Sequence, residues 1–230
     1  MEQSSVVFTR AGLLRGMRLC LPLAIGTFPV GVVYGLAARE AGMGAVYAVL
    51  TSALVWSGAA QAAALQLWDD PVPVVAVLVA VAAVSARLLL MGAALRPWLA
   101  GLGTARTYGL LAFLADGNWI VTLRAFGKGE RDAAILVGGG AIMYVAWVGG
   151  TAAGVALGGQ IVDPQAWGLD MVFGAFFAAL LAGVWRGKGD ALPWIAAGVV
   201  AVAVGAVAPS WAVPAGTLAG SLAGAARDAV

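Results

Sequence analysis

The sequence predicts an all-α polytopic membrane protein with seven or eight transmembrane helices, and three observations support this prediction. First, 62% of the residues are hydrophobic and only 10% are charged, whereas soluble domains are about one-quarter charged. Second, the mean hydropathy is +0.95. Third, apolar residues recur in runs close to the roughly 20 residues that a helix needs to cross the hydrocarbon of a bilayer. The chain is therefore expected to cross a membrane repeatedly.

Polar or helix-breaking residues separate the apolar runs and define the expected spans. The spans are Leu19–Ala38, Ala45–Leu67, Val74–Leu95, Tyr108–Phe126, Ala133–Leu157, Leu169–Trp185, Leu192–Ala208 and Trp211–Ala226. The last two are short and flank Pro209 and Pro214, so the count is seven if one of them is re-entrant or merged. Residues 1–18 are expected to be a cytoplasmic amino-terminal segment, residues 19–226 a single transmembrane domain, and residues 227–230 a tail.

The first expected span is unusually rich in helix breakers. It contains Pro22, Gly26, Pro29, Gly31 and Gly35, and a proline inside a helix removes a backbone donor. We therefore predict a helix broken around Pro29 and Gly31, whose free main-chain groups are candidates for binding a polar ligand. The alternative is a kinked helix that packs closely through its small residues.

Glycine spacing also raises the possibility of an internal repeat. Gly31-x-x-x-Gly35 in the first span resembles Gly150-x-x-x-Gly154 in the fifth, and transporters are often built from repeats. Glycine is so frequent in this chain that such matches also arise without a repeat. We interpret the glycine clusters at 138–140 and 149–150 mainly as packing positions.

Basic residues in short loops predict the orientation, because they favour the cytoplasmic side. Arg10, Arg15 and Arg18 place the amino terminus inside. Alternation of the expected spans then places Lys128, Arg131, Arg186 and Lys188 inside as well. Arg96 and Arg106 fall outside on this count, which would be explained if an early segment does not cross fully.

Two ionisable residues lie at hydrocarbon depth, where a charge is costly and usually functional. Arg87 lies in the third expected span and Asp116 in the fourth, both near the middle of a hydrocarbon core about 30 Å thick. Opposite charges at similar depth on neighbouring antiparallel helices predict mutual neutralisation. Arg87 is a candidate to receive a substrate carboxylate, and Asp116 a candidate to receive an ammonium group or a coupling proton. The alternative is a purely structural ion pair.

Polar residues of the second expected span provide further candidates for a binding site. Ser57 and Gln61 are four residues apart and so share a helix face, and Gly58 lies beside Ser57. We predict that these three residues help to line a substrate site with Trp56 nearby. Gln61 is equally well interpreted as a hydrogen-bonding contact between helices.

The residue inventory disfavours several classes of protein. The chain has no His and one Cys, which removes the commonest metal ligands and His-based catalysis. We therefore expect no cofactor, no metal site and no enzymatic activity. Lys and Arg are scattered singly and form no patch for nucleic acid, so the expected surroundings are membrane lipid.

Several stretches resemble the AzlC family of branched-chain amino acid permeases, in order along nearly the whole chain. They are Leu21-Pro22, Phe28-Pro29-Val30-Gly31, Tyr34-Gly35-Leu36-Ala37, Trp56-Ser57-Gly58-Ala59-Ala60-Gln61, Val84-Ser85-Ala86-Arg87, Leu90-Met91-Gly92, Asp116, Gly168-Leu169-Asp170, Phe173, Phe176-Phe177 and Pro214-Ala215-Gly216. Family members carry an Asn before the arginine and an acidic residue after the aspartate, where this chain has Ser85 and Gly117.

The resemblance implies the large subunit of a two-component secondary transporter in the bacterial inner membrane. Such a transporter exports branched-chain or related hydrophobic amino acids together with a small hydrophobic AzlD-type membrane subunit. One alternative is a non-transporting membrane subunit that stabilises or regulates a partner complex, in which the intramembrane charges are assembly contacts. A channel is a further alternative, and an intramembrane enzyme is disfavoured because no nucleophile and base pair is evident.

Overall fold

In a computed structural model of the chain, the described residues are 6–99, 101–158, 171, 178, 182, 185, 187–207 and 212–228. The chain divides into two compact units, residues 1–178 and 179–230. The described residues form helices, and their only strand-like feature is an isolated bridge between Val7 and Asp132. The all-α prediction is therefore confirmed for this part of the chain. The expected span Leu169–Trp185 lies almost entirely outside the described residues.

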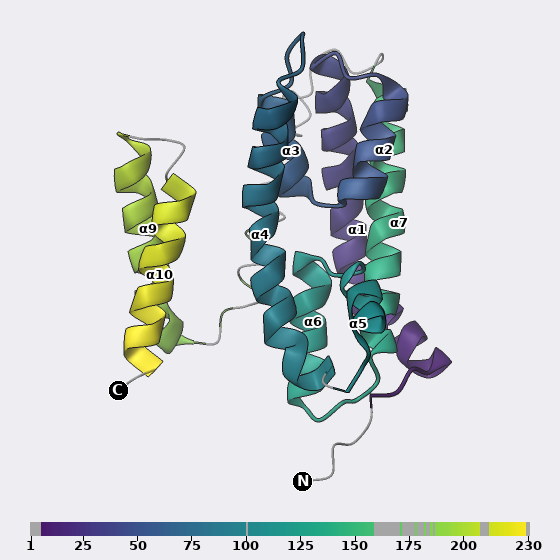
Figure 1. Cartoon of the computed structure of the whole chain (residues 1–230), viewed down its shortest axis with the longest axis vertical. Helices are drawn as coiled ribbons and strands as arrows, with labels where there is room; N and C mark the ends of the chain where they lie inside the picture. The colour runs from purple at the N-terminus through teal and green to yellow at the C-terminus, as the bar shows by residue number, and fades with distance from the viewer. Residues whose placement is uncertain are drawn as a thin grey trace. The chain divides into compact units, whose positions relative to one another are not determined.

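Three helices of the first unit are long and apolar enough to cross a membrane: α1 (Arg10–Glu40), α4 (Val74–Leu99) and α7 (Ala134–Leu157). At about 1.5 Å per residue, the 26 residues of α4 extend ~39 Å. α1 and α7 run in the same direction and α4 runs in the opposite one (Figure 1). α1 begins at Arg10, so part of the expected amino-terminal segment belongs to this helix.

The predicted break in the first helix is not confirmed. α1 is a single helix of 31 residues with Pro22 and Pro29 inside it. Its small residues instead allow close contact with α7 along its length. A Cβ atom added at Gly31 would lie 2.6 Å from the Trp147 carbonyl oxygen, and one added at Gly35 would lie 2.3 Å from that of Thr151. Packing against a neighbouring helix thus keeps a proline-containing segment helical, as is common in membranes.

The glycines of α7 complete this contact. A Cβ atom at Gly150 would lie 2.3 Å from the Phe28 carbonyl oxygen, and one at Gly154 would lie 2.1 Å from that of Val32. The two G-x-x-x-G spacings therefore face each other across one helix–helix contact. This contact accounts for their similarity without a repeat. The glycines at 138–140 and Gly150 are packing positions as predicted, whereas Gly149 is exposed.

The second expected span is a re-entrant hairpin and not a single crossing. α2 (Ala45–Val55) ends at Trp56, which has left-handed backbone angles (φ 42°, ψ 46°), and α3 (Gly58–Gln66) follows directly. α3 returns toward the end at which α2 began (Figure 1). The Gln61 Nε2 atom donates to Ser52 Oγ at 3.0 Å across this turn. A continuous helix would hold these residues about 13 Å apart along its axis.

The fourth expected span forms a second re-entrant hairpin, which enters from the opposite end. α5 (Thr104–Leu111) rises to the middle of the first unit, and α6 (Asp116–Gly127) returns to the end where α4 finishes (Figure 1). Phe126 near the end of α6 stacks on Trp98 of α4, with ring centroids 5.8 Å apart. The expected single crossings over 45–67 and 108–126 are therefore wrong, and the expected count of spans is not confirmed.

The hairpins change where the basic residues lie. Because α2 and α3 return to the same end, α4 runs back to the end at which α1 begins. This end, called the basic end below, carries most basic residues of the described part of the first unit: Arg10, Arg15, Arg18, Arg96, Arg106, Arg124, Lys128 and Arg131. The opposite end carries Arg39 with Glu40, Asp69 and Asp70. Arg96 and Arg106 thus lie at the same end as Arg10, Arg15 and Arg18, and the early segment that turns back is the α2–α3 hairpin.

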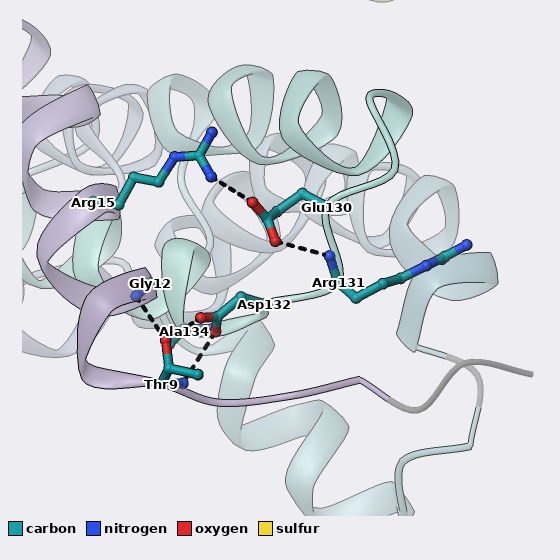
Figure 2. Close-up of polar contacts among 7 residues, drawn as sticks. All are labelled: Thr9, Gly12, Arg15, Glu130, Arg131, Asp132 and Ala134. Atoms are coloured by element: carbon teal, nitrogen blue, oxygen red, sulfur yellow. Dashed lines mark hydrogen bonds and ion pairs between the residues drawn. The ribbon is translucent and has the colours of Figure 1, made fainter.

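A polar cluster joins the amino-terminal ends of α1 and α7 at the basic end (Figure 2). Asp132 accepts hydrogen bonds from the Thr9 hydroxyl, from the Thr9 backbone N–H at 3.2 Å and from the Ala134 N–H at 3.0 Å. Thr9 Oγ1 also accepts from the Gly12 N–H at 2.9 Å, which caps α1. Arg15 pairs with Glu130 nearby. These bonds satisfy helix-terminal N–H groups and fix the start of the parallel helix pair.

The second unit contains a short 3₁₀ turn (Lys188–Asp190) followed by α9 (Ala191–Gly205) and α10 (Ala212–Asp228). The two helices form an antiparallel hairpin (Figure 1). They approach closely at Gly216, where a Cβ atom would lie 2.7 Å from the Ala197 carbonyl oxygen. The unit therefore uses the same small-residue packing as α1 and α7.

Candidate functional site

The tips of the two hairpins meet beside α4 and enclose a cavity of about 60 Å³. Ser57 and Gly58 come from the α2–α3 tip, Ala115 and Asp116 come from the α5–α6 tip, and Arg87 comes from the middle of α4. Irregular backbone at membrane depth is tolerated where it borders protein or a wet cavity. The two interrupted helices therefore mark this cavity as the candidate site.

Arg87 and Asp116 form a two-bonded ion pair in the cavity wall. Arg87 Nε donates to Asp116 Oδ1 at 3.1 Å, and Arg87 Nη2 donates to Asp116 Oδ2 at 2.9 Å. The predicted meeting of these charges is thus confirmed, with the pair made across a hairpin tip. Both side chains are 34% exposed, so each charge retains a face that is open to a ligand.

Helix amino termini add positive potential to the same cavity. α3 starts at Gly58 after Ser57, and within the described residues the Ser57 side chain makes no capping hydrogen bond to α3. Ser57 Oγ instead accepts a long 3.5 Å contact from Arg87 Nη2. First-turn N–H groups of a helix have no partner within that helix and favour anions. Because Ser57, Gly58 and Ala59 all line the cavity, this end of α3 together with Arg87 suits a carboxylate.

Asn118 holds the second tip in shape. Its Oδ1 accepts from the Ala115 N–H at 2.7 Å, while its Nδ2 donates to the Phe113 carbonyl at 2.6 Å and to the Leu136 carbonyl at 3.2 Å. The side chain is completely buried. A single amide thus pairs backbone groups that the interruption between α5 and α6 leaves free, and so places Asp116 against Arg87.

The remaining walls of the cavity are largely apolar and aromatic. Met143 and Trp147 come from α7, Val30 comes from α1, and Leu88 comes from α4. Trp56 covers a further side, and its ring meets Tyr144 edge-on with centroids 5.6 Å apart. One end of the cavity is therefore charged and the other apolar, a combination that suits a zwitterion with a hydrophobic side chain.

Tyr144 also explains how the left-handed Trp56 is stabilised. A left-handed non-glycine residue costs roughly 1–2 kcal/mol, and the end of α2 leaves carbonyl groups unpaired. Tyr144 donates its hydroxyl to the Ala53 carbonyl at 3.1 Å. α7 therefore supports the turn both by this hydrogen bond and by the aromatic contact.

The predicted site residues separate into two groups. Ser57, Gly58, Arg87 and Asp116 line the cavity, whereas Pro29, Gly31 and Gln61 are not among its lining residues. Pro29 and Gly31 lie within the continuous α1, and Gly31 contacts α7.

Gln61 belongs to a buried chain of hydrogen bonds behind the cavity. Trp147 Nε1 donates to Gln61 Oε1 at 3.1 Å, and Gln61 Nε2 donates to Ser52, whose hydroxyl lies 2.7 Å from that of Thr151. Gln61 therefore orients the indole that forms one wall of the cavity. This arrangement matches the interhelical interpretation of Gln61.

The sequence analysis missed three residues that line the cavity or hold one of its hairpin tips in place. Asn118, Met143 and Trp147 were not among the candidates, although each touches or supports the cavity. A usable signal was present, because Ser57-Gly58 and Asp116-Gly117-Asn118 are clusters of cap and turn residues inside apolar runs.

The sequence model of the AzlC protein family matches residues 22–161, which cover α1 from Pro22 onward, α2 to α7 and all lining residues of the cavity. The chain belongs to the AzlC family. No curated protein and no solved structure matches it. AzlC membership, together with the long apolar helices, makes the chain a membrane protein connected with branched-chain amino acid transport.

The two departures from the AzlC pattern occupy different places. Gly117 lines the cavity, and a Cβ atom there would lie 2.8 Å from Met143 Cε. Ser85 is not among the lining residues. Only the glycine therefore alters the space next to Asp116.

Proposed function

We propose that this chain is the large subunit of a two-component secondary transporter that exports branched-chain or related hydrophobic amino acids. The observation that carries the proposal is the Arg87–Asp116 pair between two opposed re-entrant hairpins. Interrupted helices whose ends converge on a charged site at mid-membrane depth are the usual construction of secondary transporters.

In this proposal the substrate carboxylate binds to Arg87 and the first turn of α3. A guanidinium offers several donors in a fixed plane, and the pair with Asp116 uses Nε and Nη2. The α3 terminus adds an anion-favouring dipole. A zwitterion that enters between Arg87 and Asp116 replaces one ion pair with two and leaves no buried charge without a partner.

Asp116 then receives the substrate ammonium group or a coupling proton. Carboxylates at membrane depth commonly serve in proton relays. The wall formed by Val30, Trp56, Met143 and Trp147 receives the hydrophobic side chain of the cargo. Since the cavity measures about 60 Å³ and small-molecule pockets begin at roughly 300 Å³, the hairpin tips separate when cargo binds.

The basic end faces the cytoplasm in this proposal, which places the amino terminus inside a bacterial inner membrane. The positive-inside tendency supports this orientation, because the basic residues of the first unit gather at one end. A small AzlD-type subunit completes the transporter, as family membership suggests.

Amino acid uptake into inside-out vesicles from cells that co-express both subunits tests the proposal, since export appears there as uptake. We expect leucine, valine, isoleucine or methionine to accumulate, and Arg87→Ala to lower the rate by at least ~100-fold through loss of roughly 3 kcal/mol of binding. Wild-type vesicles that move none of these amino acids would overturn the proposal and favour a non-transporting subunit.

Two further variants separate binding from structure. The exchange Arg87→Asp with Asp116→Arg retains an ion pair, so we expect protein levels to recover while transport stays low. Full recovery of transport would indicate that the pair is structural. Asp116→Asn tests proton coupling, and transport that keeps its pH dependence in this variant would exclude Asp116 from that role.

A further inference from the structure

A second, larger hollow opens on the same part of the molecule, between α4 and α5. This groove measures about 830 Å³, within the range of ordinary ligand pockets. On α4 it follows Leu88, Gly92 and Arg96, which recur every four residues and share one face. Across from them lie Thr104 and Leu111 of α5. The groove therefore runs from the basic end to the middle of α4.

Two leucines separate this groove from the central cavity. Leu88 and Leu114 line both spaces. Leu88 directly follows Arg87, and Leu114 lies in the turn that leads to Asp116. A displacement of the α5–α6 tip that moves Leu114 away from Leu88 would therefore join the small central cavity to a groove that is large enough for cargo.

The composition of the groove matches an amphipathic solute. Arg96, Thr104 and Thr107 provide polar groups toward the basic end, and Leu88, Leu89, Leu111 and Leu114 provide an apolar interior. Among the described residues Arg96 has no acidic partner. Arg87 lies nine positions earlier, about 13 Å along the same helix and on its opposite face, so a carboxylate attracted to Arg96 has to pass Leu88 and Leu114 to reach Arg87.

Hydrogen bonds join α1, α2 and α7 on the opposite side of the cavity. The hydroxyls of Tyr34 and Thr51 lie 2.8 Å apart, as part of a buried cluster with Met43 and Ala48 at the end where α2 begins. The Ser52–Gln61–Trp147 chain lies just behind the cavity. Hydrogen-bonded side chains toward one end and a groove toward the other fit one of the two states that alternating access requires.

We infer that the groove between α4 and α5 is the passage through which cargo reaches the central cavity from the basic end, with Leu88 and Leu114 as the movable partition. The inference rests on the proposed function for the identity of the cargo. It adds the route, the gate and the direction from which the site is loaded.

Cysteine reactivity in native membranes tests the passage. With the natural Cys20 replaced (Cys20→Ala), Ala93→Cys places a thiol in the groove, and Ala94→Cys places one on an exposed part of α4 outside the groove lining. A charged, membrane-impermeant methanethiosulfonate is applied to inside-out vesicles. Thiolates react and thiols in hydrocarbon do not, so we expect Ala93→Cys to react at least ~10-fold faster than Ala94→Cys. Leucine should slow the Ala93→Cys reaction.

Equal, slow reaction at both positions would show that lipid or a protein segment fills the groove, and would overturn the inference. As a second measurement, Ala93→Trp should lower amino acid transport at least ~10-fold while Ala94→Trp leaves it near the wild-type rate. Equal transport by the two tryptophan variants would also overturn it. Labelling requires no transport, so fast labelling in vesicles that move no amino acid refutes the proposed cargo while retaining a water-filled passage.

Discussion

The α2–α3 and α5–α6 hairpins share one plan but are attached to the molecule in different ways. Each enters from the end at which the preceding long helix finishes and turns back at the central cavity. The α2–α3 hairpin is joined to α1 and α7 by the Tyr34–Thr51 and Ser52–Thr151 hydroxyl pairs and by Gln61. The α5–α6 hairpin has its side-chain hydrogen bonds at and just beyond the tip, through the Asn118 amide and the Trp119 indole N–H, and α5 borders an 830 Å³ groove.

The two hairpins differ in the polar contacts that join them to their neighbours. Tyr34 is 2% exposed beside α2, whereas Tyr108 on α5 is 69% exposed. The Thr107 hydroxyl on α5 donates to the Gly103 carbonyl just before its own helix. In a bilayer, where apolar packing between helices has no hydrophobic drive, such hydrogen bonds carry much of the specificity. We therefore expect the α2–α3 hairpin to stay fixed and the α5–α6 hairpin to be the one that moves in the proposed transport cycle.

The largest effect is expected at the α5–α6 tip. Asn118→Ala removes three hydrogen bonds to backbone groups, and each buried group left unpaired costs about 1–3 kcal/mol. We expect a loss of about 3 kcal/mol or more in the free energy of unfolding, with transport abolished because Asp116 no longer meets Arg87. Unfolding in mixed detergent and SDS measures the first quantity, and vesicle uptake measures the second.

Asn118→Asp is the matched variant, because it keeps an oxygen for the Ala115 N–H but loses the donor to Phe113 and Leu136. Its stability should lie between those of wild type and Asn118→Ala. An Asn118→Ala protein with unchanged stability and transport would show that the tip is positioned by something other than this amide.

The next effect concerns the α2–α3 hairpin. Gln61→Leu leaves Trp147 Nε1 and the Ser52 hydroxyl short of a partner, which costs about 2 kcal/mol and weakens the sealed state. Since 1.4 kcal/mol corresponds to a factor of ten, the population can shift toward an outward-open state by up to ~30-fold. An impermeant thiol reagent applied to right-side-out vesicles should then label the cysteine of Thr51→Cys faster in the Gln61→Leu protein than in the protein that keeps Gln61.

Gln66→Leu serves as the control, because Gln66 lies exposed at the end of the same helix. Equal labelling of Thr51→Cys in the Gln61→Leu and Gln66→Leu backgrounds would contradict the sealing role of the buried chain. Faster labelling in both backgrounds would attribute the effect to added hydrophobicity.

A smaller effect is expected when one hydroxyl is removed from the seal. Tyr34→Phe deletes the bond to Thr51 but keeps the ring stacked near Trp147, with centroids 5.9 Å apart. We expect a loss of about 1 kcal/mol in the free energy of unfolding, measured in mixed detergent and SDS. Tyr47→Phe, on the exposed side of α2, should leave this free energy unchanged, and an equal loss in the two variants would contradict this assignment.

The sequence predicts the long helices well because hydropathy and length alone determine them. α1, α4 and α7 fall within or extend the predicted segments. The Arg87–Asp116 pair is also predictable, since isolated charges at similar depth have few other partners. In contrast, a hydropathy profile reads each hairpin as one apolar run, because the interruption occupies only a few residues around Trp56 or Ala115.

What reveals the hairpins in sequence is charge, not hydropathy. Arg96 and Arg106 violate the expected orientation only if Ala45–Leu67 is counted as a crossing, and the re-entrant α2–α3 hairpin removes the conflict. The opposite error occurred in α1, where Pro22 and Pro29 predicted a break. Close contact of Gly31 and Gly35 with α7 keeps α1 helical despite its two prolines. This contact joins two segments that are far apart in the sequence, so neither segment alone predicts it.

The smallest effect is expected for Thr122→Val, one turn beyond Asn118 on α6. Thr122 is buried, and its hydroxyl has no hydrogen-bond partner among the described residues. Replacing an unpaired hydroxyl by a methyl group of similar size removes a desolvation cost, so stability should stay the same or rise by up to ~1 kcal/mol. Detergent unfolding of this variant beside Asn118→Ala tests whether paired amides, and not buried polarity as such, hold the α5–α6 hairpin. A loss as large as that of Asn118→Ala would mean that Thr122 has a partner in the assembled protein and that this hairpin is anchored more firmly than its open groove suggests.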